Sequence, residues 1–485
     1  MTRAEGEART AEGEERTAEV GRGAARGLRW SLLGNLVNRA GTFVVGLVLA
    51  RILLPQDYGE FAIAFAASQF LMHVNDAGII AAIVQWRGRL ADLAPTATVL
   101  AFLSSTGIYL LFFAAAPWYA ATSGDAGATG VVRILTATIL VDGITAVRAA
   151  RLLREFRQDR LIVANLAGFV VTAALTIGLA LAGAGAYSFA WGQLSGAIVT
   201  GACVLWFGRM PFSVRLDRSA VRHLVVFGLP LALSLGLEGL ILNVDKMVIG
   251  SRLGAVVLGF YLIAFNVSSW VPGLIGTAIR WVALPSFSRL AEEGEAAVAA
   301  GVRTAVVTVT AFALPVMLVL GLLAPQAVTV LYGERWEPAG QALRFLAAVM
   351  LVRLLLPLAF DILTALGATR WTVVLNAGWC LALVPALLVG AGHGLGAAAA
   401  AQAVVGLGVT LPLAAWALSR VGVRVAALAR PLARPLLAAL AAGLVIAGAD
   451  RLLDAPAVVE LGVAGGAGTA LYIVLVLPLL RELRK

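Results

Sequence analysis

The chain has 485 residues, of which 60% are hydrophobic and only 13% charged, and its mean hydropathy is +0.92. Soluble domains are about 25% charged and about half apolar, and no water-soluble core of this size could bury so many apolar side chains. The composition therefore predicts an all-α polytopic membrane protein. The net charge of +10 lies in short stretches between apolar runs, which indicates membrane topology and no nucleic-acid partner.

The first residues and the cysteines exclude two further classes. Residues 1–28 are rich in Glu, Arg, Ala and Gly, so we expect a disordered cytoplasmic tail. The next apolar run is long enough to span a membrane and lacks a small-residue cleavage site, which predicts a retained first helix rather than a secretory signal. Cys203 and Cys380 lie inside apolar runs and support neither a disulfide framework nor a metal site.

About fourteen windows reach the roughly 20 apolar residues that a spanning helix needs. A tight outer turn is expected at Pro55–Gly59, and the longest connection is expected near 280–301. We predict a lobe of six helices over 29–207, a second over 208–418, and two more helices with a short cytoplasmic C-terminus over 419–485. The windows lie near 31–53, 61–84, 95–116, 130–150, 161–182, 185–207, 223–247, 256–279, 302–323, 339–365, 371–391, 394–418, 431–449 and 456–480.

The arginines alternate between rich and poor connections. If the amino terminus is inside, the inner segments near 148–160, 209–222 and 420–434 are rich in arginine, and the outer segments carry only scattered basic residues. The positive-inside rule and the even number of windows then both place the two termini in the cytoplasm. Of the 37 lysines and arginines only Lys246 and Lys485 are lysines, and the chain is rich in Ala and Gly, which indicates a GC-rich bacterial genome.

Part of the chain repeats after 200 residues. Residues 48–68 and 248–268 share seven identities in 21 ungapped positions, among them Gly59/Gly259 and Phe65/Phe265. Six windows separate the copies, so the second copy crosses the membrane in the same direction as the first. The repeat therefore predicts two lobes related by an axis along the membrane normal.

Several polar side chains lie deep inside apolar windows, where a charge costs about 3 kcal/mol and usually faces a cavity or a partner. Arginine has a planar fork that binds phosphate oxygens in pairs, so a cavity with two deep arginines suits an anionic substrate. We expect Arg39, Arg353, Asn35, Asn38 and Asn266 to line the cavity, and Asp76, Glu238, Asp245 and Asp361 to balance charge or couple to ions.

Structural roles are open alternatives for most of these residues. Asparagines can join helices by hydrogen bonds, Asp76 and Asp361 can pair with inner arginines, and basic side chains near helix ends can reach the interface. Arg39, Glu238 and Arg353 lie too deep to reach water along their own helices, so they require a cavity or a mutual ion pair.

Four segments resemble a known family. "RILLPQDYGEFAIAF" (51–65), "NDAGIIAAIVQ" (75–85), "NVDKMVIGSRLGAVVLGFYLIAF" (243–265) and "LPSFSRL" (284–290) are similar to the Wzx-type polysaccharide flippases of the multidrug/oligosaccharidyl-lipid/polysaccharide (MOP) exporter superfamily. The resemblance covers residues 29–480. It implies a V-shaped pair of six-helix lobes around a central cavity, with two C-terminal helices.

The resemblance also implies a transporter rather than an enzyme. Such flippases move undecaprenyl-diphosphate-linked oligosaccharides from the inner to the outer leaflet by alternating access, for capsule, exopolysaccharide, lipopolysaccharide or a similar glycan. Expected partners are the lipid-linked oligosaccharide, membrane lipids, and the polysaccharide polymerase and export machinery. No cofactor or metal is expected, and proton or sodium coupling is open. Ala40 follows Arg39 where lipid II flippases have an acid, which argues against lipid II.

Two rival functions stay open. A drug exporter of the same superfamily would need an acid in the first lobe, where only Asp76 could serve. A membrane-embedded polysaccharide polymerase would need a sizeable outer loop with catalytic residues, and the richest outer loop, 331–340, holds no recognisable acid pair.

Overall fold

The computed structural model describes Gly34 and residues 36–85, 90–155, 157–210, 216–423, 425–453 and 455–482. Only the backbone is described for residues 76–85, 90–92 and 479–482, and for several positions within 223–241 and 274–285. The predicted tail 1–28 and the predicted site residue Asn35 lie outside the described residues.

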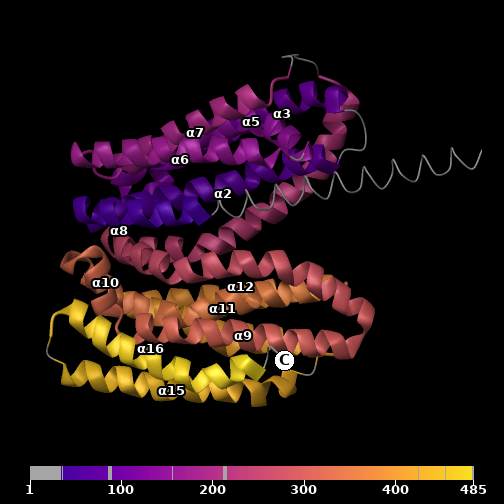
Figure 1. The fold of residues 1–485 in the computed structure, drawn as a ribbon. Coiled ribbons are helices and arrows are strands. Elements are labelled where there is room, and N and C mark those ends of the chain that lie inside the picture. The colour runs from indigo at the N-terminus through magenta and orange to yellow at the C-terminus, as the bar shows by residue number, and fades with distance from the viewer. Residues whose placement is uncertain are drawn as a thin grey trace, which may run out of the picture. The chain divides into compact units, whose positions relative to one another are not determined.

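Every regular element in the described ranges is helical (Figure 1). Residues 36–52 are helical. They are followed by α2 (Pro55–Gln85), α3 (Leu90–Thr122), η1 (Ala126–Ala128), α4 (Thr129–Thr136), α5 (Thr138–Arg154), α6 (Gln158–Leu181), α7 (Tyr187–Phe207), α8 (Arg218–Glu293) and α9 (Glu295–Leu322). The later elements are α10 (Ala324–Tyr332), η2 (Glu334–Ala339), α11 (Gly340–Ala365), α12 (Arg370–Ala391), α13 (Leu395–Val405), the π-helical η3 (Gly406–Thr410), α14 (Leu411–Ser419), η4 (Val425–Leu428), α15 (Ala429–Leu452) and α16 (Ala457–Glu482).

Eleven helical stretches in the described part of the chain are long and apolar enough to cross a membrane. Ten of them coincide with the predicted windows from 95–116 to 185–207 and from 302–323 to 456–480. The eleventh, Leu242–Gly273, covers most of the window 256–279 but only the last six residues of the window 223–247. Residues 36–52 of the window 31–53 and the whole window 61–84 are also helical. The all-α polytopic membrane fold is therefore confirmed, whereas the count of fourteen spans stays a prediction.

The predicted tight turn at Pro55–Gly59 was wrong, because these residues form the start of α2. Pro55 fits a first helical position, where no backbone N–H is needed. The Asp57 carboxylate accepts a hydrogen bond from the backbone N–H of Leu54 at 2.8 Å, as the acidic residue of a capping box does. Pro55 and Gly59, which suggested a turn, here lie in the first turns of a helix.

The long connection expected near 280–301 is also helical. The helix α8 continues to Glu293, and α9 begins at Glu295 after Gly294, whose φ of 109° breaks the helix. Helices thus extend well beyond their apolar windows, because hydropathy records contact with lipid and not the backbone hydrogen bonds that define a helix.

The chain divides into two compact units, which are described separately. Unit 1 consists of Met1–Ile52, Ile63–Thr122 and Ala126–Asn243. Unit 2 consists of Leu53–Ala62, Ser123–Asp125 and Val244–Lys485. The lobe boundaries predicted after residues 207 and 418 stay predictions.

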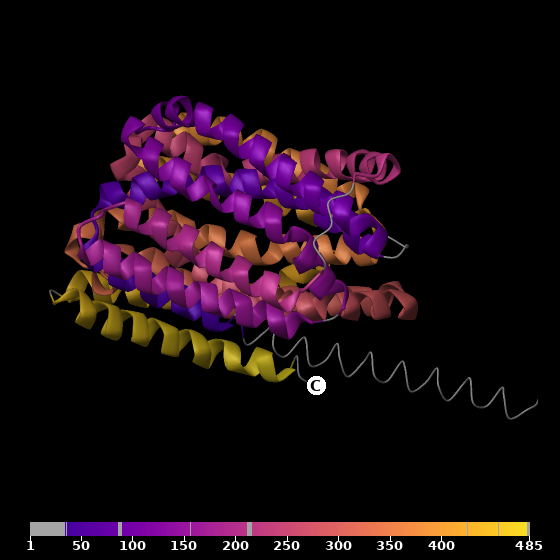
Figure 2. The same ribbon diagram turned by 90° about the horizontal axis from the view of Figure 1, so that it is seen from above.

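In unit 1, α6 and α7 pack closely along small residues. A Cβ atom added to Gly168 or Gly196 would overlap a threonine side chain of the facing helix, and the same holds for Gly192. Glycine on one helix and threonine on the other let the two backbones approach, as is common between helices in lipid. Figure 2 shows the helices of this unit lying lengthwise beside one another.

In unit 2, α15 and α16 lie side by side and pack against α9 (Figure 1). Their shared core contains Leu314, Ala442 and Val476. The Tyr472 hydroxyl donates a hydrogen bond to the backbone oxygen of Ala311 at 2.9 Å. A buried hydroxyl therefore has a partner at this apolar interface, which fixes the two C-terminal helices on α9.

The two copies of the sequence repeat meet inside unit 2. A Cβ atom added to Gly59 would overlap the carbonyl oxygen of Ala255, and one added to Gly259 would overlap that of Pro55. Positions 55 and 255 are equivalent in the repeat, as are 59 and 259. The glycine of each copy therefore faces the equivalent carbonyl group of the other copy. Gly254, with a φ of 84°, interrupts α8 just before this contact, so both copies begin a fresh helical segment at equivalent places.

Candidate functional site

A connected polar network lies in unit 2, where α8 meets α11 and α13. Helix α8 supplies most of its side chains, on both sides of the break at Gly254. The members of this network are Asp245, Lys246, Tyr261, Phe265, Ser268, Ser269, Arg353 and Gln402.

The carboxylate of Asp245 is held at both oxygens. The Tyr261 hydroxyl donates to Oδ2 at 2.5 Å, and the Lys246 ammonium lies 3.4 Å from Oδ1. Gln402 of α13 donates to the Tyr261 hydroxyl oxygen at 2.7 Å. All four residues are less than 10% exposed. Buried charges are tolerated when they are paired and hydrogen-bonded, and this arrangement meets that condition.

Arg353 lies on α11 and is only partly buried. Its Nη1 donates to the hydroxyl of Ser269 at 2.6 Å and to that of Ser268 at 3.3 Å. The described ion pairs include none between Arg353 and an acidic side chain. Because a guanidinium has five N–H donors, these two hydroxyls leave donors that can bind an anion.

Phe265 connects the two cations. The ammonium nitrogen of Lys246 lies 4.3 Å from the centre of its ring, and the guanidinium carbon of Arg353 lies 4.2 Å from it. Cation–π contacts of this kind stabilise a positive charge without neutralising it. Among the described side chains the network holds two cations and one carboxylate, an excess of one positive charge that favours an anionic ligand.

The network brings together two of the predicted site residues, Arg353 and Asp245. Asp361 is partly buried on α11, two turns beyond Arg353. The side chains of Arg39, Asn38 and Asn266 are exposed. The side chains of Asp76 and Glu238 lie outside the described residues, as does Asn35. The roles of all these residues stay predictions.

The sequence analysis did not single out Tyr261, Phe265 or Gln402. Gln402 is the polar residue of the Ala-rich run 395–405, which is a signal that could have been used. Tyr261 gave no comparable signal, since its partner Asp245 is 16 residues away across the break at Gly254.

Comparison with known proteins supports a transport fold. The model of the polysaccharide biosynthesis protein family matches residues 48–341. The succinoglycan biosynthesis transport protein ExoT of Rhizobium meliloti (strain 1021) is 27% identical over 337 residues. That match covers 66% of this chain and 65% of the relative, so the chain spans just under two thirds of its length.

Solved structures show the same fold at low sequence identity. The lipid II flippase MurJ in an inward closed conformation has a TM-score of 0.78 at 12% identity, with 94% of this chain and 100% of that chain covered. An inward-facing multidrug resistance MATE family transporter of the MOP superfamily has a TM-score of 0.57 at 16% identity, with 82% and 99% covered. At these identities the likeness establishes the fold alone.

Proposed function

Because this chain belongs to the polysaccharide biosynthesis protein family, we propose that it moves a lipid-linked oligosaccharide from the inner to the outer leaflet of the bacterial cytoplasmic membrane. The relatives are transporters, and the chain has the multi-pass fold of the MOP superfamily. In this proposal the carrier is undecaprenyl diphosphate, the movement is alternating access, and the glycan is a capsule, exopolysaccharide or similar surface polymer.

The observation that carries the proposal is the arrangement around Arg353. Its described contacts are two hydroxyl groups and an aromatic ring rather than a carboxylate. An arginine inside a membrane protein is costly unless it faces a partner or a cavity, and a diphosphate is the anion for which its planar fork is best suited. A substrate diphosphate would place negative charge beside the guanidinium of Arg353.

The other charges receive supporting roles in this proposal. Asp245 balances the charge of Lys246. Arg39, Asn35, Asn38 and Asn266 contact the diphosphate or the sugars, and Asp76, Glu238 and Asp361 balance charge or couple transport to protons or sodium. A polymerase and the export machinery would act on the transported unit afterwards, and both termini would lie in the cytoplasm.

The test is transport by the purified full-length protein in vesicles. The probe is an undecaprenyl-diphosphate oligosaccharide with a fluorescent sugar, which a membrane-impermeant reductant bleaches on the outer face. We expect Arg353→Ala to slow transfer at least about tenfold, since a charge-assisted hydrogen-bonded partner is lost. Arg353→Lys should be intermediate, because it keeps the charge without the fork.

The matched control is Arg344→Ala, which removes an exposed arginine from the same helix. It should transport at the wild-type rate. Equal transfer by Arg353→Ala and the control would contradict the role of Arg353. Transfer of a cationic dye but not of the lipid-linked sugar by the wild-type protein would replace the proposal with the drug exporter.

A further inference from the structure

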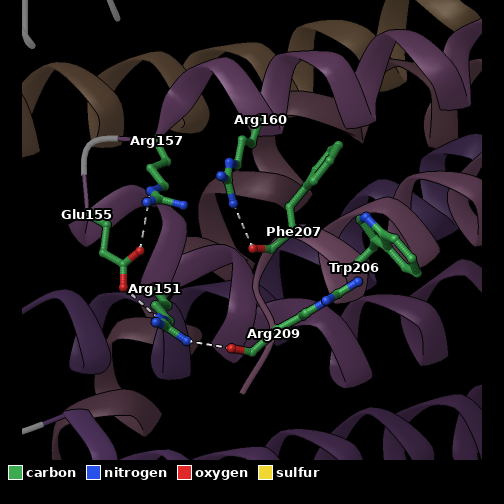
Figure 3. A pocket seen from close by; sticks show the side chains of 7 residues that line it. All are labelled: Arg151, Glu155, Arg157, Arg160, Trp206, Phe207 and Arg209. Atoms are coloured by element: carbon green, nitrogen blue, oxygen red, sulfur yellow. Dashed lines mark hydrogen bonds and ion pairs between the residues drawn. The ribbon is translucent and has the colours of Figure 1, made fainter. Parts of the chain in front are cut away.

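A second basic site lies in unit 1, far along the chain from the network around Arg353. The end of α5, the start of α6 and the end of α7 border an open cavity of about 550 Å³ (Figure 3). Four arginines and one glutamate line it together with two aromatic residues. The charged residues are Arg151, Glu155, Arg157, Arg160 and Arg209.

Two of the arginines are fixed by backbone carbonyl groups. Arg151 donates from Nη1 to the carbonyl oxygen of Arg209 at 2.8 Å, and Arg160 donates from Nη1 to that of Phe207 at 3.2 Å. In Figure 3 the guanidinium groups of Arg151, Arg157 and Arg160 surround one hollow. The cavity is thus a built arrangement that joins three helices, rather than a set of independent surface arginines.

The acidic side chain does not neutralise the cavity. Glu155 lies 2.6 Å from Nε of Arg151 and 3.8 Å from Nε of Arg157, so one carboxylate serves two arginines. Four positive charges and one negative charge give the lining a net charge of +3. Arg157 and Arg160 lie at the amino-terminal end of α6, which is the positive end of its helix dipole; Asp159 in the same turn is exposed and does not line the cavity.

The aromatic residues indicate where the ligand comes from. Trp206 is 66% exposed, and the guanidinium carbon of Arg209 lies 4.3 Å from the centre of its ring. Tryptophan at the end of a spanning helix is typical of the membrane–water interface. The positive-inside rule assigns this end of the helices to the cytoplasmic surface, where anionic headgroups attract basic residues.

We propose that this cavity binds the phosphate group of an anionic phospholipid of the inner leaflet. The guanidinium groups of Arg157 and Arg160 contact the phosphate oxygens. Glu155, which pairs with Arg151, positions Arg157, and the Phe207 carbonyl positions Arg160. Trp206 with Arg209 lies beside the glycerol region. The site shares no residue with the proposed transport network, so its test measures lipid binding and does not depend on which substrate is moved.

The experiment compares lipid retention by native mass spectrometry of the purified full-length protein. The protein is released from bilayers of equal parts phosphatidylglycerol and phosphatidylcholine. We expect the wild-type protein to retain phosphatidylglycerol selectively and Arg157→Gln/Arg209→Gln to reduce this retention about tenfold, from the loss of two cations near the membrane surface. Neither of these side chains is among the two fixed by backbone carbonyls.

The control is Arg133→Gln, which also removes an arginine stacked on an aromatic ring, that of Phe113, but outside the cavity. It should retain lipid as the wild type does. Glu155→Gln raises the lining charge to +4 and should increase retention, which keeps the test open if the double variant does not fold. Equal retention of phosphatidylglycerol by all variants would overturn the proposal. Retention without preference for phosphatidylglycerol over phosphatidylcholine, together with displacement of the bound lipid by inorganic phosphate, would also overturn it.

Discussion

Asp245 is the carboxylate that pairs with Lys246, in a network that also holds the cation of Arg353. A buried ion pair contributes little net stability, because desolvation offsets the attraction, but the removal of one partner leaves a buried charge uncompensated. The pair therefore serves to position its neighbours. Through Tyr261 it also connects α8 to Gln402 of α13.

This argument predicts the effect of Asp245→Asn. Lys246 loses the carboxylate at 3.4 Å and the Tyr261 hydroxyl loses an ionised acceptor, so we expect a loss of about 3 kcal/mol of stability. The thermal midpoint of the purified protein in detergent measures it. Lys246→Met in the same chain should recover part of the loss, whereas Glu337→Gln, at an exposed acid, should change nothing. An unchanged midpoint in Asp245→Asn would show that the pair does not hold the network.

At this scale the sequence revealed charges but not their partners. Arg353 and Asp245 could be singled out because a charge inside an apolar window is rare. Tyr261 and Gln402 could not be paired, since 141 residues separate them and both are ordinary inside helices. The fold determines which residues come together in a site, and the type of a single residue does not reveal its partners.

At the scale of elements, hydropathy located the helices and misplaced their ends. The helix α2 begins at Pro55 rather than near 61, and α8 continues to Glu293 rather than ending near 279. The break inside α8 is at Gly254, and the break between α8 and α9 is at Gly294. Both glycines have a positive φ, which glycine adopts without steric strain. A break of this kind can be predicted from glycine only when the apolar windows on either side already suggest two helices.

The reciprocal contact of α2 with α8 gives a prediction for these elements. Gly59→Val and Gly259→Val each place side-chain atoms where a carbonyl oxygen of the other helix lies, so the two helices must separate. We expect each variant to lose about 1–3 kcal/mol of stability, as in overpacked cores, and to transport more slowly. The thermal midpoint and the vesicle assay measure the two effects.

Gly178→Ala is the control for this pair. No atom lies within 4 Å of a Cβ atom added to this helical glycine of α6, so alanine should be neutral or slightly stabilising. If Gly59→Val and Gly259→Val had unequal effects, the equivalence of the two repeat copies at this contact would fail. If both behaved like Gly178→Ala, the close approach of the helices would not matter for stability.

At the scale of the whole molecule, the repeat was the informative part of the sequence. Seven identities in 21 positions predicted two related copies, and the Gly59 and Gly259 contacts show these copies meeting in the same way. The division of the chain into two compact units could not be predicted from the sequence. Unit 2 includes Leu53–Ala62 and Ser123–Asp125, short segments far from Val244 in the sequence, and no change of composition marks them.

The placement of both termini in the cytoplasm rests on arginine distribution and has a direct test. Glu337 and Ser419 are both exposed, and three spans lie between them: α11, α12 and α13 with α14. An odd number of crossings puts them on opposite sides, and the positive-inside rule makes Glu337 external. With Cys203 and Cys380 replaced by Ala, a membrane-impermeant maleimide should label Glu337→Cys in intact cells and Ser419→Cys only after permeabilisation. The reverse pattern would invert the topology, and with it the assignment of the arginine cavity to the inner leaflet. Labelling of both in intact cells would mean that one of the three helices does not cross the membrane.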